Sequence, residues 1–89
     1  MKSVTTERFR KLYDALPKHV KELTRKAYQK WKENPNHPSL QFKQVHKTQA
    51  VYSVRITISY RTLGVKQGNM MIWFWIGSHS EYDKLIASL

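Results

Sequence analysis

Apolar residues recur with a helical period over the first third of the chain. Large apolar side chains at i, i+3, i+4 and i+7, counted from Phe9, predict an amphipathic helix over residues 5–16. Thr5 or Thr6 is its expected N-cap. A proline then interrupts the pattern and suits the first turn of a new helix, so a second helix is expected over residues 17–33. Two helices with one tight connection are typical of an αα-hairpin.

The pattern changes after residues 34–38, which contain two prolines and cannot continue a helix. Residues 40–45 alternate weakly and predict a first strand. Residues 52–60 alternate cleanly, provided that the pairing does not slip at a turn near residues 57–59. Leu63 is apolar where the alternation requires a polar residue, so a turn or bulge should split this stretch into two strands. The predicted apolar face consists of Tyr52, Val54, Ile56, Ile58 and Tyr60.

The longest apolar run of the chain comes near its end. Residues 67–69 predict a hairpin turn, which leads into seven consecutive large apolar residues, Met70–Ile76. Such a run is typical of a strand buried on both faces, in the middle of a sheet. Its alternation places Trp73 and Trp75 on one face. The last residues, 81–89, are expected to form a short C-terminal helix.

The chain has 89 residues and contains no cysteine. This length predicts a single domain over residues 1–89. Without cysteine there is no disulfide framework, thiolate zinc site or cysteine nucleophile, which fits a reducing compartment and a cytoplasmic protein. No apolar segment reaches the length needed to span a bilayer, and the N-terminus lacks the apolar core of a signal peptide.

The balance of charge is strongly basic, with sixteen Lys and Arg against six Asp and Glu, a net charge of +10. This excess indicates a polyanionic partner, of which nucleic acid is the commonest. A basic surface without a specific partner is the plain alternative, and a membrane surface is less favoured because the cations are not gathered on one amphipathic helix. No acidic residue occurs from Asn34 to Ser80. The cations in that interval include Lys43, Lys47, Arg55, Arg61 and Lys66.

Metal binding and serine hydrolysis both lack support in the sequence. The four histidines show no close pair at ligand spacing, so no metal site and no cofactor are expected. The segment Ser78–Glu81 contains hydroxyl, imidazole and carboxyl groups, but it has no nucleophile elbow. The histidines are His19, His37, His46 and His79.

Phosphodiester chemistry fits the polar residues better. Cleavage of RNA by its own 2′-OH needs a base for that hydroxyl, cations for the charge on phosphorus and an acid for the 5′ oxygen. Histidine side chains exchange protons near neutrality, which suits His79, and Glu81 is a natural base, while Arg55 and Arg61 are permanent cations that hold phosphate. As alternatives, the arginines are ordinary strand residues and Glu81 caps the last helix. The residues that could stack on a base are Tyr60 and Tyr82.

The predicted elements follow one another as two helices and then four strands, and four stretches of sequence carry this arrangement. They read LPKHVKELTRKAYQKWKENPNHPSLQFKQV, YSVRI, SYRTLG and MMIWFWIGSHSEYDKL. In this arrangement the chain, over residues 8–88, resembles the RelE/ParE superfamily of bacterial toxins from toxin-antitoxin pairs. The resemblance implies a small α+β fold. Two N-terminal helices would pack on one face of a twisted antiparallel sheet, followed by a short C-terminal helix, and leave a basic concave face.

The resemblance also implies a function. RelE-like members enter the ribosomal A site and cut mRNA, with cations on the middle strands and a basic or acid-base residue after the last strand. Arg55, Arg61 and His79 match those positions in this sequence, and Glu81 and Tyr82 complete the expected catalytic set. The cations expected to bind RNA are Lys43, Lys47 and Lys66.

The function that we favour is that of a metal-independent, ribosome-dependent mRNA endoribonuclease. ParE-like members instead inhibit DNA gyrase and need no nuclease site, and a non-catalytic RNA-binding protein that keeps the fold is a third alternative. In each toxin case the expected partner is an acidic cognate antitoxin that orders as it binds the basic surface. The protein would then be a monomer alone or a heteromer with its antitoxin.

Overall fold

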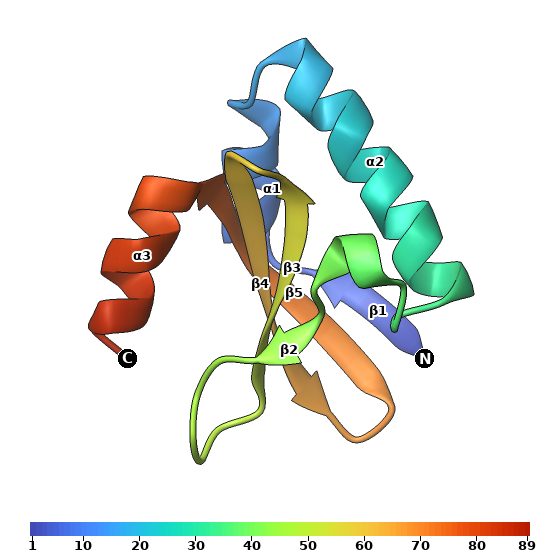
Figure 1. The fold of residues 1–89 in the computed structure, drawn as a ribbon, viewed down its shortest axis with the longest axis vertical. Helices are drawn as coiled ribbons and strands as arrows, with labels where there is room; N and C mark the ends of the chain where they lie inside the picture. Colours follow the sequence, from blue (N-terminus) through green and yellow to red (C-terminus); the bar gives the residue numbers. More distant parts are fainter.

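The computed structural model describes residues 1–89 and combines three α-helices and one short 3₁₀ helix with a five-stranded sheet (Figure 1). The predicted α+β class is therefore confirmed. None of the helices has the length and hydropathy required to cross a membrane. In chain order the elements are β1 (Lys2–Thr5), α1 (Glu7–Asp14), α2 (Lys18–Glu33), η1 (Pro38–Leu40), β2 (Lys43–Gln44), β3 (Val51–Thr57), β4 (Tyr60–Gln67), β5 (Met70–Ser78) and α3 (His79–Ala87).

The sheet has the strand order β1-β5-β4-β3-β2, and its neighbours from β5 to β2 run antiparallel. β1 runs parallel to β5, with Lys2 opposite Met70 and Thr5 opposite Trp73. The sheet is therefore mixed, which corrects the prediction of a wholly antiparallel sheet and of a helix from residue 5. Sequence reasoning missed β1 because a four-residue strand with one half-buried side chain is too short to show a period of two.

Two of the three α-helices, α1 and α3, begin after a residue whose side chain caps them. The Oγ1 of Thr6 accepts a hydrogen bond from the N–H of Phe9 at 3.1 Å, so α1 starts one residue after this N-cap. α2 follows Pro17, and α3 begins at His79, two residues before its predicted start, because Ser78 serves as its N-cap. The buried side chains of α2 lie at helical spacing and are Val20, Thr24, Ala27 and Trp31.

β3 and β4 form a hairpin that turns at residues 58–59, within the predicted turn region. This turn splits the stretch into two strands, so no break is needed at Leu63. Leu63 shares the parity of Arg61 and is fully buried, because the face to which both project becomes apolar along β4. The predicted strand over residues 40–45 is replaced by η1 and the two-residue strand β2.

A bulge in β5 decides where two tryptophans lie. Gly64 pairs with Trp73 and Leu63 with Trp75, so Phe74 is an extra residue without a partner on β4. The bulge resets the alternation, and the prediction that the two tryptophans share one face is wrong: they belong to different hydrophobic clusters. A Cβ on Gly64 would lie 2.6 Å from the indole Cε3 of Trp73, so glycine is required where this ring crosses β4.

Helices cover both faces of the sheet, with α2 and α3 on opposite sides (Figure 1). On the face covered by α1 and α2, called the α2 face below, Trp31 packs edge to face on Trp73 with ring centroids 5.1 Å apart. The core of this face is formed by Ala27, Trp31, Leu40, Val54, Met71 and Trp73. The core of the other face, called the α3 face, is formed by Val51, Leu63, Trp75 and Tyr82.

Candidate functional site

Arg55 and Arg61 lie directly opposite each other on β3 and β4. Residues paired directly in an antiparallel ladder project to the same face. The next pair on that face, Ser53 and Leu63, lies beneath Tyr82, so both arginines belong to the α3 face as their parity predicted. Both are half-buried. Like charges directly opposite each other destabilise a sheet, so this pair favours an anion beside the two guanidinium groups.

Arg61 is held in place by the hairpin turn. Its Nη1 donates hydrogen bonds to the carbonyls of Thr57 at 2.6 Å and Tyr60 at 3.0 Å, with a longer contact of 3.5 Å to Ile58. Its Nε and Nη2 remain available to a ligand. Burial, followed by the positive charge of Arg55, lowers the pKa of the Arg61 guanidinium from its ordinary value. An anion bound here would counteract both effects, because a neighbouring negative charge favours the charged guanidinium.

His79 is the first residue of α3, where β5 ends. Its Nδ1 lies 3.1 Å from an Oδ2 of Asp83, one helical turn further on, and its side chain is 44% exposed. If Nδ1–H donates to this carboxylate, Nε2 is free to exchange a proton with a substrate. The backbone N–H of His79 donates to the carbonyl of Ser59 at 2.7 Å, which fixes the start of α3 against the hairpin turn.

Sequence reasoning missed Asp83 as a member of this site. Its charge also reaches Arg61, where it raises the pKa of the guanidinium against the larger lowering effects. The available signal was the spacing i, i+4 between His79 and Asp83, which places two side chains on the same side of a helix. That signal depends on where the helix begins, and a start at residue 81 leaves His79 outside it.

Glu81 closes the capping box of α3. Its Oε1 accepts from the hydroxyl of Ser78 at 2.9 Å and from the backbone N–H of Ser78 at 3.4 Å, while the Ser78 hydroxyl accepts from the N–H of Glu81 at 3.2 Å. These bonds satisfy donors that a helix start leaves unpaired. Its catalytic role stays a prediction, and the geometry directs the carboxylate to the helix start.

Tyr82 anchors α3 to the sheet. Its ring is 7% exposed and lies against Trp75, with centroids 6.5 Å apart. Its hydroxyl donates to the Oγ of Ser53 at 3.2 Å. A ring buried in this way cannot stack on a base in this conformation, which corrects that part of the prediction. Tyr60 is half-buried in β4, next to the hairpin turn, and its stacking role stays a prediction.

The three lysines predicted to bind RNA lie in different places. Lys43 on β2 pairs with Ser53, so it projects to the α3 face, two positions along from Arg55. Lys66 pairs with Met71, a core residue of the α2 face, and therefore projects away from the arginines. Lys47 is exposed in the loop between β2 and β3. The structure brings only Lys43 onto the same face as the arginine pair.

The site thus combines two half-buried guanidinium groups with an imidazole held by a carboxylate, all at the turn end of the α3 face. Such a set can bind a phosphate and move a proton beside it. No group of three His, Cys, Asp or Glu side chains is placed to hold a metal ion.

Comparison with known proteins identifies the class. The fold is that of the RelE/ParE superfamily of toxins. The sequence profile of the ParE-like toxin domain matches residues 18–84, and the chain belongs to this family. No curated protein sequence matches the chain.

Solved structures of toxins share the fold. A YoeB/ParE toxin from Agrobacterium tumefaciens is 18% identical with a TM-score of 0.69, covering 89% of this chain and 99% of its own. The RelB-RelE antitoxin-toxin complex from Methanococcus jannaschii contains a chain that is 19% identical, with a TM-score of 0.68 and coverages of 91% and 96%. The isolated RelE toxin of E. coli is 15% identical, with a TM-score of 0.67 and coverages of 99% and 98%.

Proposed function

We propose that this protein is the toxin of a toxin-antitoxin pair and acts as a metal-independent, ribosome-dependent mRNA endoribonuclease. The observation that supports this most strongly is the pair Arg55 and Arg61, directly opposed and half-buried. Arg61 pairs with Gly77 on β5, two residues before His79. A pair of like charges costs stability unless an anion is bound. Family membership and the net charge of +10 support the same proposal.

The chemistry divides among four side chains. Arg55 and Arg61 hold the scissile phosphate and stabilise the charge that builds on its oxygens as the 2′-OH attacks phosphorus. The Nε2 of His79 takes the proton of the 2′-OH, and Asp83 stabilises the imidazolium that forms. The bond from phosphorus to the 5′ oxygen then breaks, that oxygen takes up a proton from solvent water, and the His79 imidazolium returns its proton to the solvent. The products are a 2′,3′-cyclic phosphate and a 5′-hydroxyl.

The proposed partners follow from charge and family. The message and the ribosome are polyanions, which a basic protein approaches readily. Complexes of RelE with the antitoxin RelB have been solved from two archaea, Methanococcus jannaschii and Pyrococcus horikoshii, and we extend such a partner to this chain as an acidic antitoxin. Because ribosomes and messages are cytoplasmic, the protein would act in the cytoplasm.

Cleavage of a defined message on programmed ribosomes tests the proposal. The protein is first dialysed against EDTA and then added to ribosomes in their own magnesium buffer. The proposal expects cleavage of the ribosome-bound message and none of the free message. A supercoiling assay with DNA gyrase runs beside it, because the family profile carries the name ParE-like. Inhibition of supercoiling with an intact message would replace the nuclease by gyrase inhibition.

A further inference from the structure

Ile58 occupies the tip of the turn between β3 and β4 and is 75% exposed, more than any other exposed large apolar residue of the chain. Neither the core nor the turn explains an isoleucine at this position. Tight hairpin turns favour Asn, Asp and Gly, whereas β-branched side chains favour strands. An apolar residue that breaks the local rules in this way is a candidate for a functional contact.

The turn that carries Ile58 is fixed by hydrogen bonds to the residues on either side of it. The Oγ1 of Thr57 accepts from the N–H of Ser59 at 3.1 Å. The Nη1 of Arg61 donates to the carbonyl of Thr57 at 2.6 Å, and the N–H of His79 donates to the carbonyl of Ser59 at 2.7 Å. Two residues of the proposed nuclease site therefore hold the turn, and Ile58 stands between their contacts.

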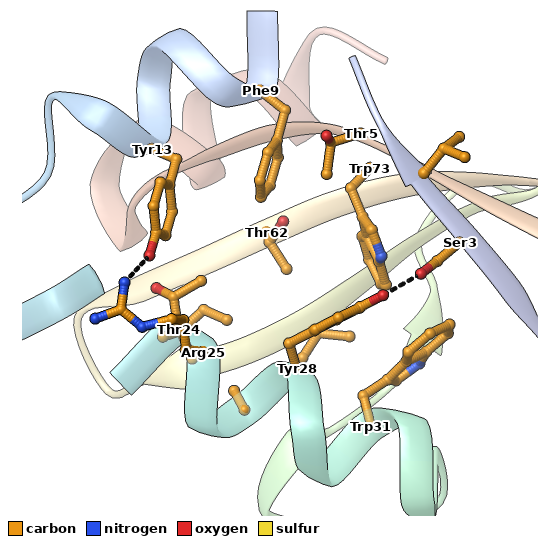
Figure 2. Close-up of a pocket in the computed structure, with 14 residues that line it drawn as sticks. Ser3, Thr5, Phe9, Tyr13, Thr24, Arg25, Tyr28, Trp31, Thr62 and Trp73 are labelled. Atoms are coloured by element: carbon orange, nitrogen blue, oxygen red, sulfur yellow. Dashed lines mark hydrogen bonds between the residues drawn. The ribbon is translucent and has the colours of Figure 1, made fainter. Parts of the chain in front are cut away.

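The rest of the site offers a nucleobase no fully exposed aromatic ring. Tyr82 is buried beneath α3, and Tyr60 is half-buried in β4. The aromatic rings that line a pocket between α1, α2 and the sheet lie on the α2 face, away from the arginine pair (Figure 2). Ile58 is therefore the one large, exposed apolar side chain next to this site. The others lie on β1, on α2 and at the chain ends and are Met1, Val4, Tyr28 and Leu89.

The proposed reaction requires an RNA strand that departs from its stacked form. The 2′-OH must attack phosphorus in line with the departing 5′ oxygen, and two stacked neighbouring bases hold the strand in a helical geometry that does not align these atoms. An apolar side chain inserted between two bases unstacks them and kinks the strand, and isoleucine is one of the side chains that proteins use in this way. Its β-branched side chain also has few rotamers to lose on contact.

We propose that Ile58 is a substrate-positioning residue, which inserts between the two bases that flank the scissile phosphate and unstacks them. Arg55 and Arg61 hold the phosphate, and the inserted side chain turns the 2′-OH toward the line of attack. The occupant is RNA because the charged groups beside Ile58 are cationic and neither β3 nor β4 contains an acidic residue. This inference rests on the proposed function, since it specifies how that site holds its substrate.

A fluorescent base tests the unstacking directly. The probe is a message on programmed ribosomes, with 2-aminopurine placed in turn at each position of the A-site codon and 2′-deoxynucleotides throughout that codon to block the reaction. 2-Aminopurine is quenched when it stacks, so its fluorescence reports unstacking. We expect the wild-type protein to raise the fluorescence about two-fold or more at one position, and Ile58→Ala to leave it near the value without protein.

Cleavage rates separate positioning from binding. In single-turnover reactions, Ile58→Ala should lower the maximal rate by about 10–100-fold and change the half-saturating protein concentration by less than about three-fold. Ile58→Val keeps a β-branched apolar side chain and should recover most of the rate and of the fluorescence. Val4→Ala removes an exposed β-branched side chain from β1 and should behave as the wild type. Thermal unfolding verifies that each variant stays folded.

Three results would overturn the inference. The first is no rise in fluorescence with the wild-type protein, even where the message is cut. The second is a wild-type rate and fluorescence in Ile58→Ala. The third is an unchanged maximal rate with weaker binding, which would assign Ile58 to a contact with a protein of the ribosome. The nuclease proposal fails separately: a wild-type protein that unstacks the probe through Ile58 but leaves an all-ribose message intact would keep the contact and lose the chemistry.

Discussion

The two faces of the sheet differ in how completely they are packed. On the α3 face, Tyr82 is buried against Trp75 and its hydroxyl is bonded to Ser53. On the α2 face, a pocket of about 360 Å³ remains between the helices and the sheet. The indole N–H groups of Trp31 and Trp73 are buried there without a hydrogen-bond partner, which costs stability.

The main core and the proposed chemistry therefore lie on opposite faces of the sheet. The α2 face holds the larger core and the pocket, whereas the α3 face holds a smaller core at one end and the arginine pair at the other. Substitutions on the two faces should therefore have different consequences. Loss of a core ring should destabilise the protein, and loss of a charged group at the turn end should slow cleavage by a protein that stays folded.

The largest effect is expected from the two tryptophans of β5. Trp73→Ala and Trp75→Ala should each lower the free energy of unfolding by about 3–5 kcal/mol, a large share of the roughly 5–15 kcal/mol of a small domain. Each ring belongs to the core of a different face. Urea titration followed by circular dichroism measures the loss. A native transition in Trp75→Ala, with loss of RNA binding alone, would show that this ring is not core.

The next largest effect is expected at His79, on cleavage instead of on stability. His79→Ala should slow cleavage of the ribosome-bound message by about 10²–10⁴-fold, the usual loss when a proton-transfer group is removed. His19→Ala, an exposed histidine on α2, is the matched control and should cleave normally. Rates are measured in single-turnover reactions. Equal rates for the two variants would remove His79 from the mechanism.

Substitution of Arg61 should also affect cleavage more than stability. Arg61→Ala should slow cleavage by about 10²–10³-fold. It should cost no more than about 1 kcal/mol of stability, because the loss of its bonds to the turn carbonyls is partly offset by relief of the repulsion from Arg55. Arg61→Lys should recover only part of the rate, since a point charge cannot reproduce a planar, two-pronged contact. Full activity in Arg61→Ala would show that the arginine only supports the turn.

The smallest effect is expected from two single hydroxyls, one on each face. Tyr82→Phe should destabilise the protein by about 0.5–1.5 kcal/mol, because the Ser53 hydroxyl is left buried without its donor. Tyr28→Phe removes the exposed bond to Ser3 and should cost less. Thermal unfolding compares the two. A larger loss in Tyr28→Phe would reverse the assignment of Tyr82 as the anchor of α3.

Much of the fold was predictable because its elements are long and periodic. α2 has sixteen residues with a regular buried stripe, and β3 alternates cleanly, so both were found with their correct faces. β1 and the bulge at Phe74 were not found, because each depends on pairing with a distant strand and produces no periodic pattern in the sequence. The position of Trp75 therefore could not be derived from its own strand.

The sequence predicted which charged residues of the candidate site share a face, but not which contacts its other residues make. The alternation of β3 predicted that Arg55 and Arg61 share a face, and their direct pairing confirms it. The roles of Glu81 and Tyr82 depend on where α3 begins and on what lies beneath it, which local pattern does not reveal. The capping box turns Glu81 toward the helix start, and the neighbouring core buries Tyr82.

The chemical ends of the cleaved message test the central claim most directly. If a phosphate held by Arg55 and Arg61 is attacked by the neighbouring 2′-OH, the products carry a 5′-hydroxyl and a 2′,3′-cyclic phosphate, and a message with a 2′-deoxynucleotide at the cleavage position stays intact. End-labelling with polynucleotide kinase and mass spectrometry identify both ends. Products with a 5′-phosphate and a 3′-hydroxyl, or cleavage of the deoxy-substituted message, would contradict the account.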